Sequence, residues 1–136
     1  MIELRMCFAA EAVVRDAVTN SISVFNLLDD IAAAGAPFFM QKVAFVALWR
    51  RATEDPDRVA GRFSVVMNER NLFAQPIEVD FAGRPQARTM VNLGGLVVPG
   101  PGTVRFRIDL ETGARAEYEI NVQITPVVAQ AQPRPQ

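Results

Sequence analysis

The alternation of hydrophobic and polar residues near the end of the chain predicts a β-hairpin. Apolar residues alternate with charged ones over residues 104–110, and the same period of two continues over residues 114–124. The intervening residues 111–113 have the length of a three-residue hairpin loop, and Gly113 can adopt the positive φ that such a loop requires. The pattern therefore predicts two antiparallel strands.

The loop length also predicts which residues face one another across this hairpin. On the apolar side Phe106 faces Tyr118, with Leu110 opposite Ala114, Ile108 opposite Ala116 and Val104 opposite Ile120. On the polar side the expected pairs are Asp109 with Arg115, Arg107 with Glu117 and Arg105 with Glu119. A shift of two residues would place Asp109 against Glu117, so charge favours the first register. Each cross-strand pair contributes only about 0.2–1 kcal/mol, but all of them agree.

Turn signals at short spacing predict further strands in the rest of the chain. The expected strands cover residues 2–10, 21–31, 38–50, 62–68, 72–81 and 89–98. Pro76 cannot donate a hydrogen bond to a neighbouring strand, which predicts that 72–81 lies at a sheet edge or carries a bulge. Gly94 and Gly95 predict a bulge or a close backbone approach within 89–98.

The stretch 21–31 allows two interpretations. Its residues are apolar on both faces, as expected of a central strand, and Gly35 and Pro37 end the pattern soon afterwards. A helix is the alternative, because Ile22, Phe25 and Leu28 also follow helical spacing. The β-branched residues at its start favour the strand.

The pattern as a whole predicts an all-β fold. Seven or eight antiparallel strands indicate a β-sandwich of immunoglobulin-like or C2-like architecture, formed as one domain by residues 1–125. Residues 126–136 contain three prolines and show no periodicity, so we expect a disordered tail there.

Composition narrows the possible partners and the origin. Of the 136 residues, 50% are hydrophobic and 21% are charged, and the net charge of −1 gives no field that would attract nucleic acid or an anionic membrane. The sequence contains no run of 18 apolar residues, the length that a membrane-spanning helix needs. Lys42 is the only lysine beside thirteen arginines, and with nineteen alanines this favours a GC-rich, bacterial genome.

The beginning of the chain predicts a cytoplasmic protein. Glu3, Arg5 and Glu11 interrupt the apolar stretch that a signal peptide would need. Cys7 is the only cysteine, so no disulfide can form within the chain, and its apolar neighbours predict that it is buried. A reducing cytoplasm suits such a chain.

The chain lacks the residues on which common enzyme chemistry depends. It has no histidine, which removes the commonest general base and the usual transition-metal ligand. The single cysteine excludes a CxxC motif, and neither a P-loop nor a GxSxG motif is present. We therefore expect a protein that is not an enzyme and needs no cofactor.

Two groups of residues are weak binding candidates. Asp29 and Asp30 could supply oxygen ligands for Ca²⁺ at a strand end, as in a C2-like domain that docks on membranes. Trp49, followed by Arg50 and Arg51, could form a stacking platform for a sugar or another small molecule beside the loop 50–58. The plainer interpretations are a solvated strand end for the two aspartates and a place in the core for the tryptophan.

The leading functional hypothesis is a non-catalytic binding or assembly module. Residues 21–31 and 38–49 are apolar on both faces, and Phe38 and Phe39 cannot both face one core. We expect such a module to associate with itself or to dock on a protein partner through a sheet face or edge.

The N-terminal arrangement also resembles a known family. Residues 6–11 (Met-Cys-Phe-Ala-Ala-Glu), the pair Arg15-Asp16 and residues 21–31 are similar to an uncharacterised bacterial domain family. The similarity extends through residues 45–49 and 99–102 to the final hairpin, over residues 3–124 in all. This resemblance implies a small β-sandwich of unknown function and assigns no catalytic or binding residue.

Overall fold

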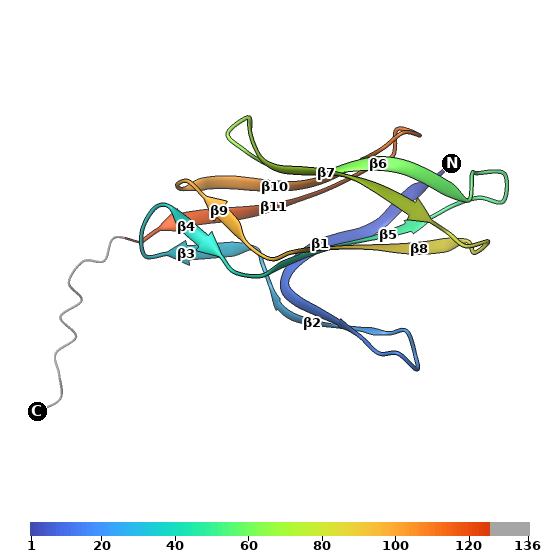
Figure 1. Ribbon diagram of the computed structural model, residues 1–136, viewed down its shortest axis with the longest axis horizontal. Coiled ribbons are helices and arrows are strands. Elements are labelled where there is room, and N and C mark those ends of the chain that lie inside the picture. The colour runs from blue at the N-terminus through green and yellow to red at the C-terminus, as the bar shows by residue number, and fades with distance from the viewer. Residues whose placement is uncertain (126–136) are drawn as a thin grey trace, which may run out of the picture.

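The computed structural model describes residues 1–125, and within this range it contains strands and no helix, hence no helix that could span a membrane (Figure 1). The prediction of a disordered tail at 126–136 concerns residues that lie outside the described range. The eleven strands of the described range are β1 (Glu3–Arg15), β2 (Ile22–Leu27), β3 (Asp30–Ala33), β4 (Phe38–Met40), β5 (Val43–Arg50), β6 (Arg58–Met67), β7 (Arg70–Asp80), β8 (Gln86–Leu93), β9 (Leu96–Val98), β10 (Gly102–Leu110) and β11 (Arg115–Ile124).

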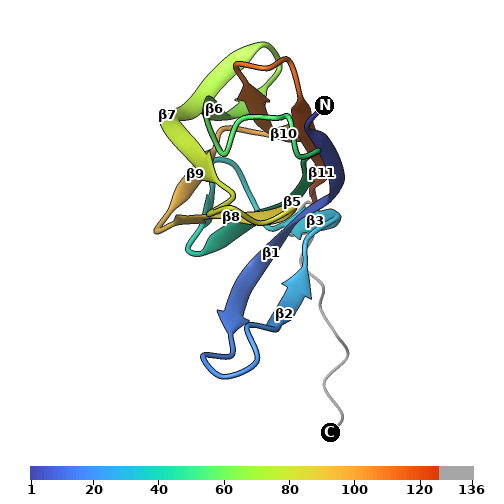
Figure 2. The same ribbon diagram turned by 90° about the vertical axis from the view of Figure 1, so that its right-hand side faces the viewer.

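Two main sheets lie one above the other and enclose the core (Figures 1 and 2). One has the strand order β2-β1-β5-β8, and the other has the order β3-β11-β10-β6-β7. A small third sheet pairs β4 with β9. The predicted all-β, sandwich-like fold is confirmed, and every strand pair is antiparallel except β3 with β11, which is parallel.

The stretch 21–31 is extended, as predicted, but it is not a central strand. It divides into β2 and β3, which lie at the edges of different sheets. Asn26 adopts a φ of 55°, a left-handed conformation that asparagine tolerates, and the chain then crosses from one sheet to the other. The prediction of one central strand was wrong. The residues are apolar on both faces because the stretch passes from one sheet to the other and because β2 leaves apolar side chains exposed at a sheet edge.

Two other predicted strands are also divided, which raises the strand number above seven or eight. Residues 38–50 form β4 and β5, and residues 89–98 form β8 and β9. The break in the second pair falls at Gly94 and Gly95, where a Cβ atom added to Gly95 would lie 2.8 Å from the Phe39 ring. The predicted close approach is therefore real, and it lets β9 pair with β4.

The C-terminal hairpin has the predicted register. Phe106 is paired with Tyr118, and Asp109 is paired with Arg115. The Nε atom of Arg115 lies 2.6 Å from a carboxylate oxygen of Asp109, and Arg105 lies 3.0 Å from Glu119. The strand that contains Pro76, β7, is the edge of its sheet, as predicted.

The main core lies between the two large sheets. Phe45 and Phe106 come from opposite sheets and stack with their ring centroids 5.9 Å apart, and Phe63 packs beside them. Trp49 is fully buried, and its indole N–H donates to the hydroxyl of Thr89 at 3.0 Å. Aromatic residues from both layers thus hold the sandwich together.

Candidate functional site

The four-stranded sheet is apolar on its outer face as well as on its inner face. Successive residues of a strand point to opposite faces of a sheet. Phe45 and Trp49 of β5 point into the main core, so the residues between them, and the residues paired with those on β1 and β8, point away from it. The outward set includes Phe8, Val46 and Met90, which are neighbours across β1, β5 and β8. A sheet with two apolar faces needs a second cover.

The hairpin of β1 and β2 supplies part of that cover. Beyond its pairing with β5, β1 continues to Arg15 and forms an arm with β2 that leaves the main body (Figures 1 and 2). Phe8, Ala10 and Val46 are buried in a second hydrophobic cluster, against which Val13 and Ile22 of the arm pack. We call residues 10–27 the arm.

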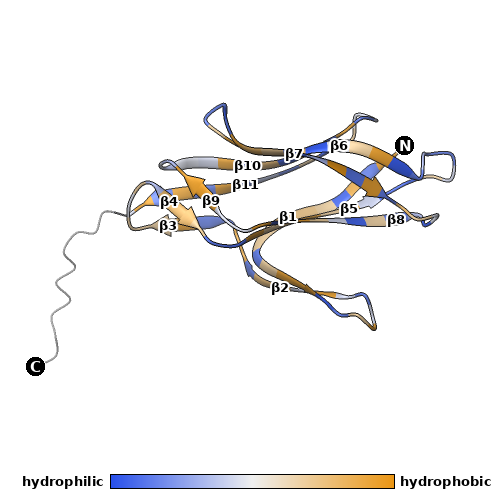
Figure 3. Cartoon of the chain, viewed as in Figure 1, coloured by the Kyte–Doolittle hydropathy of each residue, from blue (hydrophilic) through white to orange (hydrophobic). Residues whose placement is uncertain are grey.

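The cover is incomplete, and apolar side chains remain exposed around β2. Phe25 and Leu27 are 53% and 57% exposed, and Met6 of β1 is 52% exposed. The coloured ribbon shows hydrophobic residues along β2 (Figure 3). A shallow depression of about 530 Å³ lies between β1, β2 and β11, lined by Met6, Cys7, Phe8, Val24, Leu27 and Tyr118.

The polar atoms of this depression already have partners. The hydroxyl of Tyr118 donates to the carbonyl of Leu28 at 2.5 Å, and the Cys7 thiol donates to the carbonyl of Glu117 at 3.4 Å. Burial raises the pKa of both side chains, so each keeps its proton at neutral pH. The depression therefore offers apolar contact and no free hydrogen-bonding side chain.

The outer edge of β2 carries no protection against pairing with another strand. Edge strands are commonly protected by charged residues or proline. The opposite edge, β7, has Pro76 with Glu78 and Asp80, whereas the sequence of β2, Ile-Ser-Val-Phe-Asn-Leu, has neither charge nor proline. The left-handed Asn26 leaves residues 22–25 as the regular part of this edge.

A second exposed apolar pair lies on the small sheet. Phe39 of β4 and Val97 of β9 face each other in the register and are 55% and 54% exposed. Of the predicted apolar run 38–40, Met40 is buried and Phe38 is half-buried. This pair is smaller than the apolar surface of the arm.

Comparison with known proteins identifies the family. The family of unknown function DUF6941 matches residues 5–123, which is most of the chain. The chain belongs to the DUF6941 family. This confirms the resemblance to an uncharacterised domain family that the N-terminal residues carry.

The DUF6941 chain was also compared with proteins of curated function and with solved structures. No protein of curated function matches it. The solved structure titled as BslA, a bacterial hydrophobin, aligns with 90% of this chain and 100% of that chain at 12% sequence identity. The TM-score of that alignment is 0.39.

The structure separates the predicted binding residues of this DUF6941 chain. Trp49 is buried, so its indole cannot stack on a sugar, and the interpretation as a core residue is confirmed. Arg50 is exposed at the end of β5. Arg51 is committed to the fold: it donates to the carbonyl oxygens of Arg84 and Asp55, and its guanidinium lies 5.5 Å from the centroid of Phe81.

Asp29 and Asp30 mark the crossing from β2 to β3. The Asp29 carboxylate accepts a hydrogen bond from the amide of Asp30 at 2.6 Å, and the Asp29 carbonyl accepts one from the amide of Asn121. Within residues 1–125, no group of three or more acidic, cysteine or histidine side chains gathers as a possible metal site. Asp29 and Asp30 lie where the chain passes from the sheet of β2 to the sheet of β3.

The sequence marks residues 21–31 as apolar on both faces, but it does not show that part of this stretch forms an exposed sheet edge. The exposed residues Val24, Phe25 and Leu27 were expected inside a central strand, and their sequence pattern is the same in either place. Only the pairing of β2 with the far half of β1 shows that these residues border an open edge.

Proposed function

We propose that this DUF6941 chain is a non-catalytic assembly module that pairs with a second copy of itself through β2, in the cytoplasm of a bacterium. The observation that carries the proposal is the uncharged open edge of β2, flanked by exposed apolar side chains. An antiparallel pair of β2 strands about a two-fold axis would join two four-stranded sheets into one of eight strands.

Charge favours a second copy as the occupant of this edge. In a two-fold pair every residue of β2 meets a residue of the same strand, so a charged strand would risk opposing like charges. β2 contains only apolar residues, Ser23 and Asn26, and therefore allows every register. Backbone N–H and C=O groups along residues 22–25 would supply the hydrogen bonds.

The exposed area is adequate for such a contact. Val24 and Phe25 point to opposite faces of β2, so both faces of the joined sheet gain apolar contact. With Leu27, Met6 and Val14, they expose on the order of 400 Å² of apolar side chain per copy, about half of the ~800 Å² that each partner buries in a standard interface. Backbone and polar side chains of the arm would contribute the remainder.

Light scattering on a sizing column tests this proposal. We expect the wild-type chain to form a dimer at micromolar concentrations and Phe25→Lys to be monomeric, because lysine on the edge opposes pairing. Ser23→Lys removes no apolar side chain, and it should also shift the dimer toward the monomer. Circular dichroism of each variant checks that the sandwich remains folded.

Phe39→Lys is the matched control, because Phe39 and Phe25 are almost equally exposed. This variant should remain dimeric. A wild-type chain that stays monomeric at high micromolar concentration overturns self-association and leaves docking on another protein. Dissociation by Phe39→Lys but not by Phe25→Lys would instead place the interface on the small sheet.

A further inference from the structure

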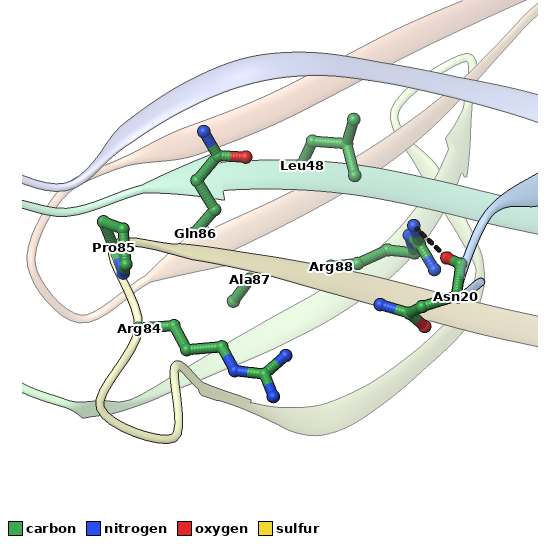
Figure 4. A pocket seen from close by; sticks show the side chains of 7 residues that line it. All are labelled: Asn20, Leu48, Arg84, Pro85, Gln86, Ala87 and Arg88. Atoms are coloured by element: carbon green, nitrogen blue, oxygen red, sulfur yellow. Dashed lines mark hydrogen bonds between the residues drawn. The ribbon is translucent and has the colours of Figure 1, made fainter. Parts of the chain in front are cut away.

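A second hollow lies at the tip of the arm. It has a volume of about 320 Å³ and is formed by the start of β8, the turn before it and the tip of the arm (Figure 4). The side chains of Arg84 and Arg88 both extend toward Asn20 in this view. The residues that line it are Asn20, Leu48, Arg84, Pro85, Gln86, Ala87 and Arg88.

Neither guanidinium group of this hollow has a carboxylate partner among the described residues. Five of the twelve arginines in the described range form ion pairs, and Arg84 and Arg88 are among the seven with no carboxylate of residues 1–125 within 4 Å. Residues 126–136 contain no aspartate or glutamate. The carboxylates nearby in the chain are bound elsewhere: Asp80 and Asp57 accept hydrogen bonds from the amides of Ala82 and Gly83 in the turn before β8, and Asp16 accepts from the amides of Val18 and Thr19.

Arg88 is also incompletely hydrogen-bonded. Its Nη2 atom donates to the carbonyl of Asn20 at 3.0 Å, which ties the tip of the arm to β8. Its Nε atom is buried and has no hydrogen-bond partner among the described residues. A half-buried guanidinium with no carboxylate partner is unfavourable, and an anion in the hollow would supply the missing charge.

The remaining walls restrict the size and character of the ligand. Leu48, Pro85 and Ala87 are apolar, so the hollow combines a cationic side with an apolar side. Its volume is at the low end of the roughly 300–1,000 Å³ of small-molecule sites. Guanidinium groups bind planar carboxylates and phosphates through paired hydrogen bonds.

We propose that this hollow binds a small organic anion, with its carboxylate or phosphate on Arg84 and Arg88 and its apolar part on Leu48, Pro85 and Ala87. The site draws on both β8 and Asn20 of the arm, so the bound anion would also hold the arm against the sheet. This site is independent of the pairing proposed for β2.

Calorimetric titration with benzoate, phenyl phosphate and inorganic phosphate tests the site. We expect saturable binding of an aromatic anion at millimolar or lower concentration, weaker binding of inorganic phosphate, and no binding of neutral benzamide. The relative affinities of benzoate and phenyl phosphate decide between a carboxylate and a phosphate ligand. Bound anion should also raise the melting temperature, because a ligand of the folded state stabilises it.

Arg84→Gln and Arg88→Gln should each weaken binding about tenfold or more, because each removes a charge-assisted hydrogen bond. Arg70→Gln, at an exposed arginine of β7, removes the same charge elsewhere and should leave the affinity unchanged. Arg84 is exposed, so its variant tests binding even where Arg88→Gln lowers stability. Equal binding of benzamide and benzoate, an equal effect of Arg70→Gln, or no binding of any anion would overturn the site.

Discussion

The two hairpins at the ends of the chain use the same kinds of residue for opposite purposes. In the C-terminal hairpin, β10 and β11 place one apolar face in the core and a row of arginine–carboxylate pairs on the other face. In the N-terminal hairpin, β2 pairs with β1 at the sheet edge, has no charged residue and leaves Phe25 and Leu27 exposed. The comparison shows that hydrophobic residues stabilise the sandwich in one hairpin and remain exposed at a sheet edge in the other.

Replacing one phenylalanine in each hairpin should separate these roles most clearly. Phe106 is fully buried and stacks on Phe45, so we expect Phe106→Ala to lower the free energy of unfolding by about 3–5 kcal/mol. Phe25 is half-exposed, and Phe25→Ala should lower it by less than about 1 kcal/mol in the monomer. Urea denaturation of both variants measures the difference, and equal losses would contradict the comparison.

The next largest effect should come from the close packing of β10 on β6. A Cβ atom on Gly61 would lie 2.7 Å from the carbonyl oxygen of Asp109 and 2.7 Å from a methyl carbon of Leu110. Because the backbone of β10 would have to move to make room for this carbon, Gly61→Ala should lower the free energy of unfolding by about 1–3 kcal/mol. Gly35→Ala is the control, because nothing lies within 4 Å of its added carbon. A stable Gly61→Ala variant would show that β10 is held less rigidly than the register implies.

The C-terminal hairpin could be predicted from sequence because its information is local. Alternation, a loop of three residues and the charges at 109 and 115 specify one register, and Pro76 similarly specifies an edge. The place of β2 could not be predicted, because an apolar strand looks the same at an edge as in the centre. The parallel pairing of β3 with β11 depends on the packing of distant segments, which no local pattern encodes.

The candidate sites show the same limit. Trp49 was correctly expected in the core from its residue type. The role of Arg51 in holding the loop depends on contacts with Phe81 and Arg84, which lie 30 and 33 positions further along the chain. Arg88 is one of thirteen arginines in the sequence, and nothing near it marks a site. Its contact with Asn20 joins residues 68 positions apart. Only the folded chain brings these groups together.

A smaller effect should follow from removing the hydrogen bond that links Tyr118 of the C-terminal hairpin to Leu28, the residue that follows the arm. Tyr118→Phe removes the bond to the Leu28 carbonyl and should lower stability by about 0.5–1.5 kcal/mol. Burial raises the pKa of Tyr118, so its contribution is present below the unfolded value of about 10 and is lost as the pH rises through the folded value. Denaturation at pH 7 and above pH 10 should show a larger loss of stability in the wild type than in the variant, since burial also raises the pKa of Cys7, which both proteins contain.

The smallest effect should be confined to the tip of the arm. Hydrogen bonds from the amides of Val18 and Thr19 lower the pKa of Asp16, so the carboxylate stabilises this turn above its unfolded value of about 3.9, and that contribution is lost as the pH falls through the folded value. Asp16→Asn keeps an oxygen acceptor but does not titrate. In an acid titration followed by NMR, the amides of Val18 and Thr19 should shift in the wild type and remain fixed in the variant. The amide of Gly113, in the turn of the other hairpin, should not respond to this substitution. A response there would mean that the two hairpins are coupled, and the arm could then no longer be treated as a surface separate from the sandwich.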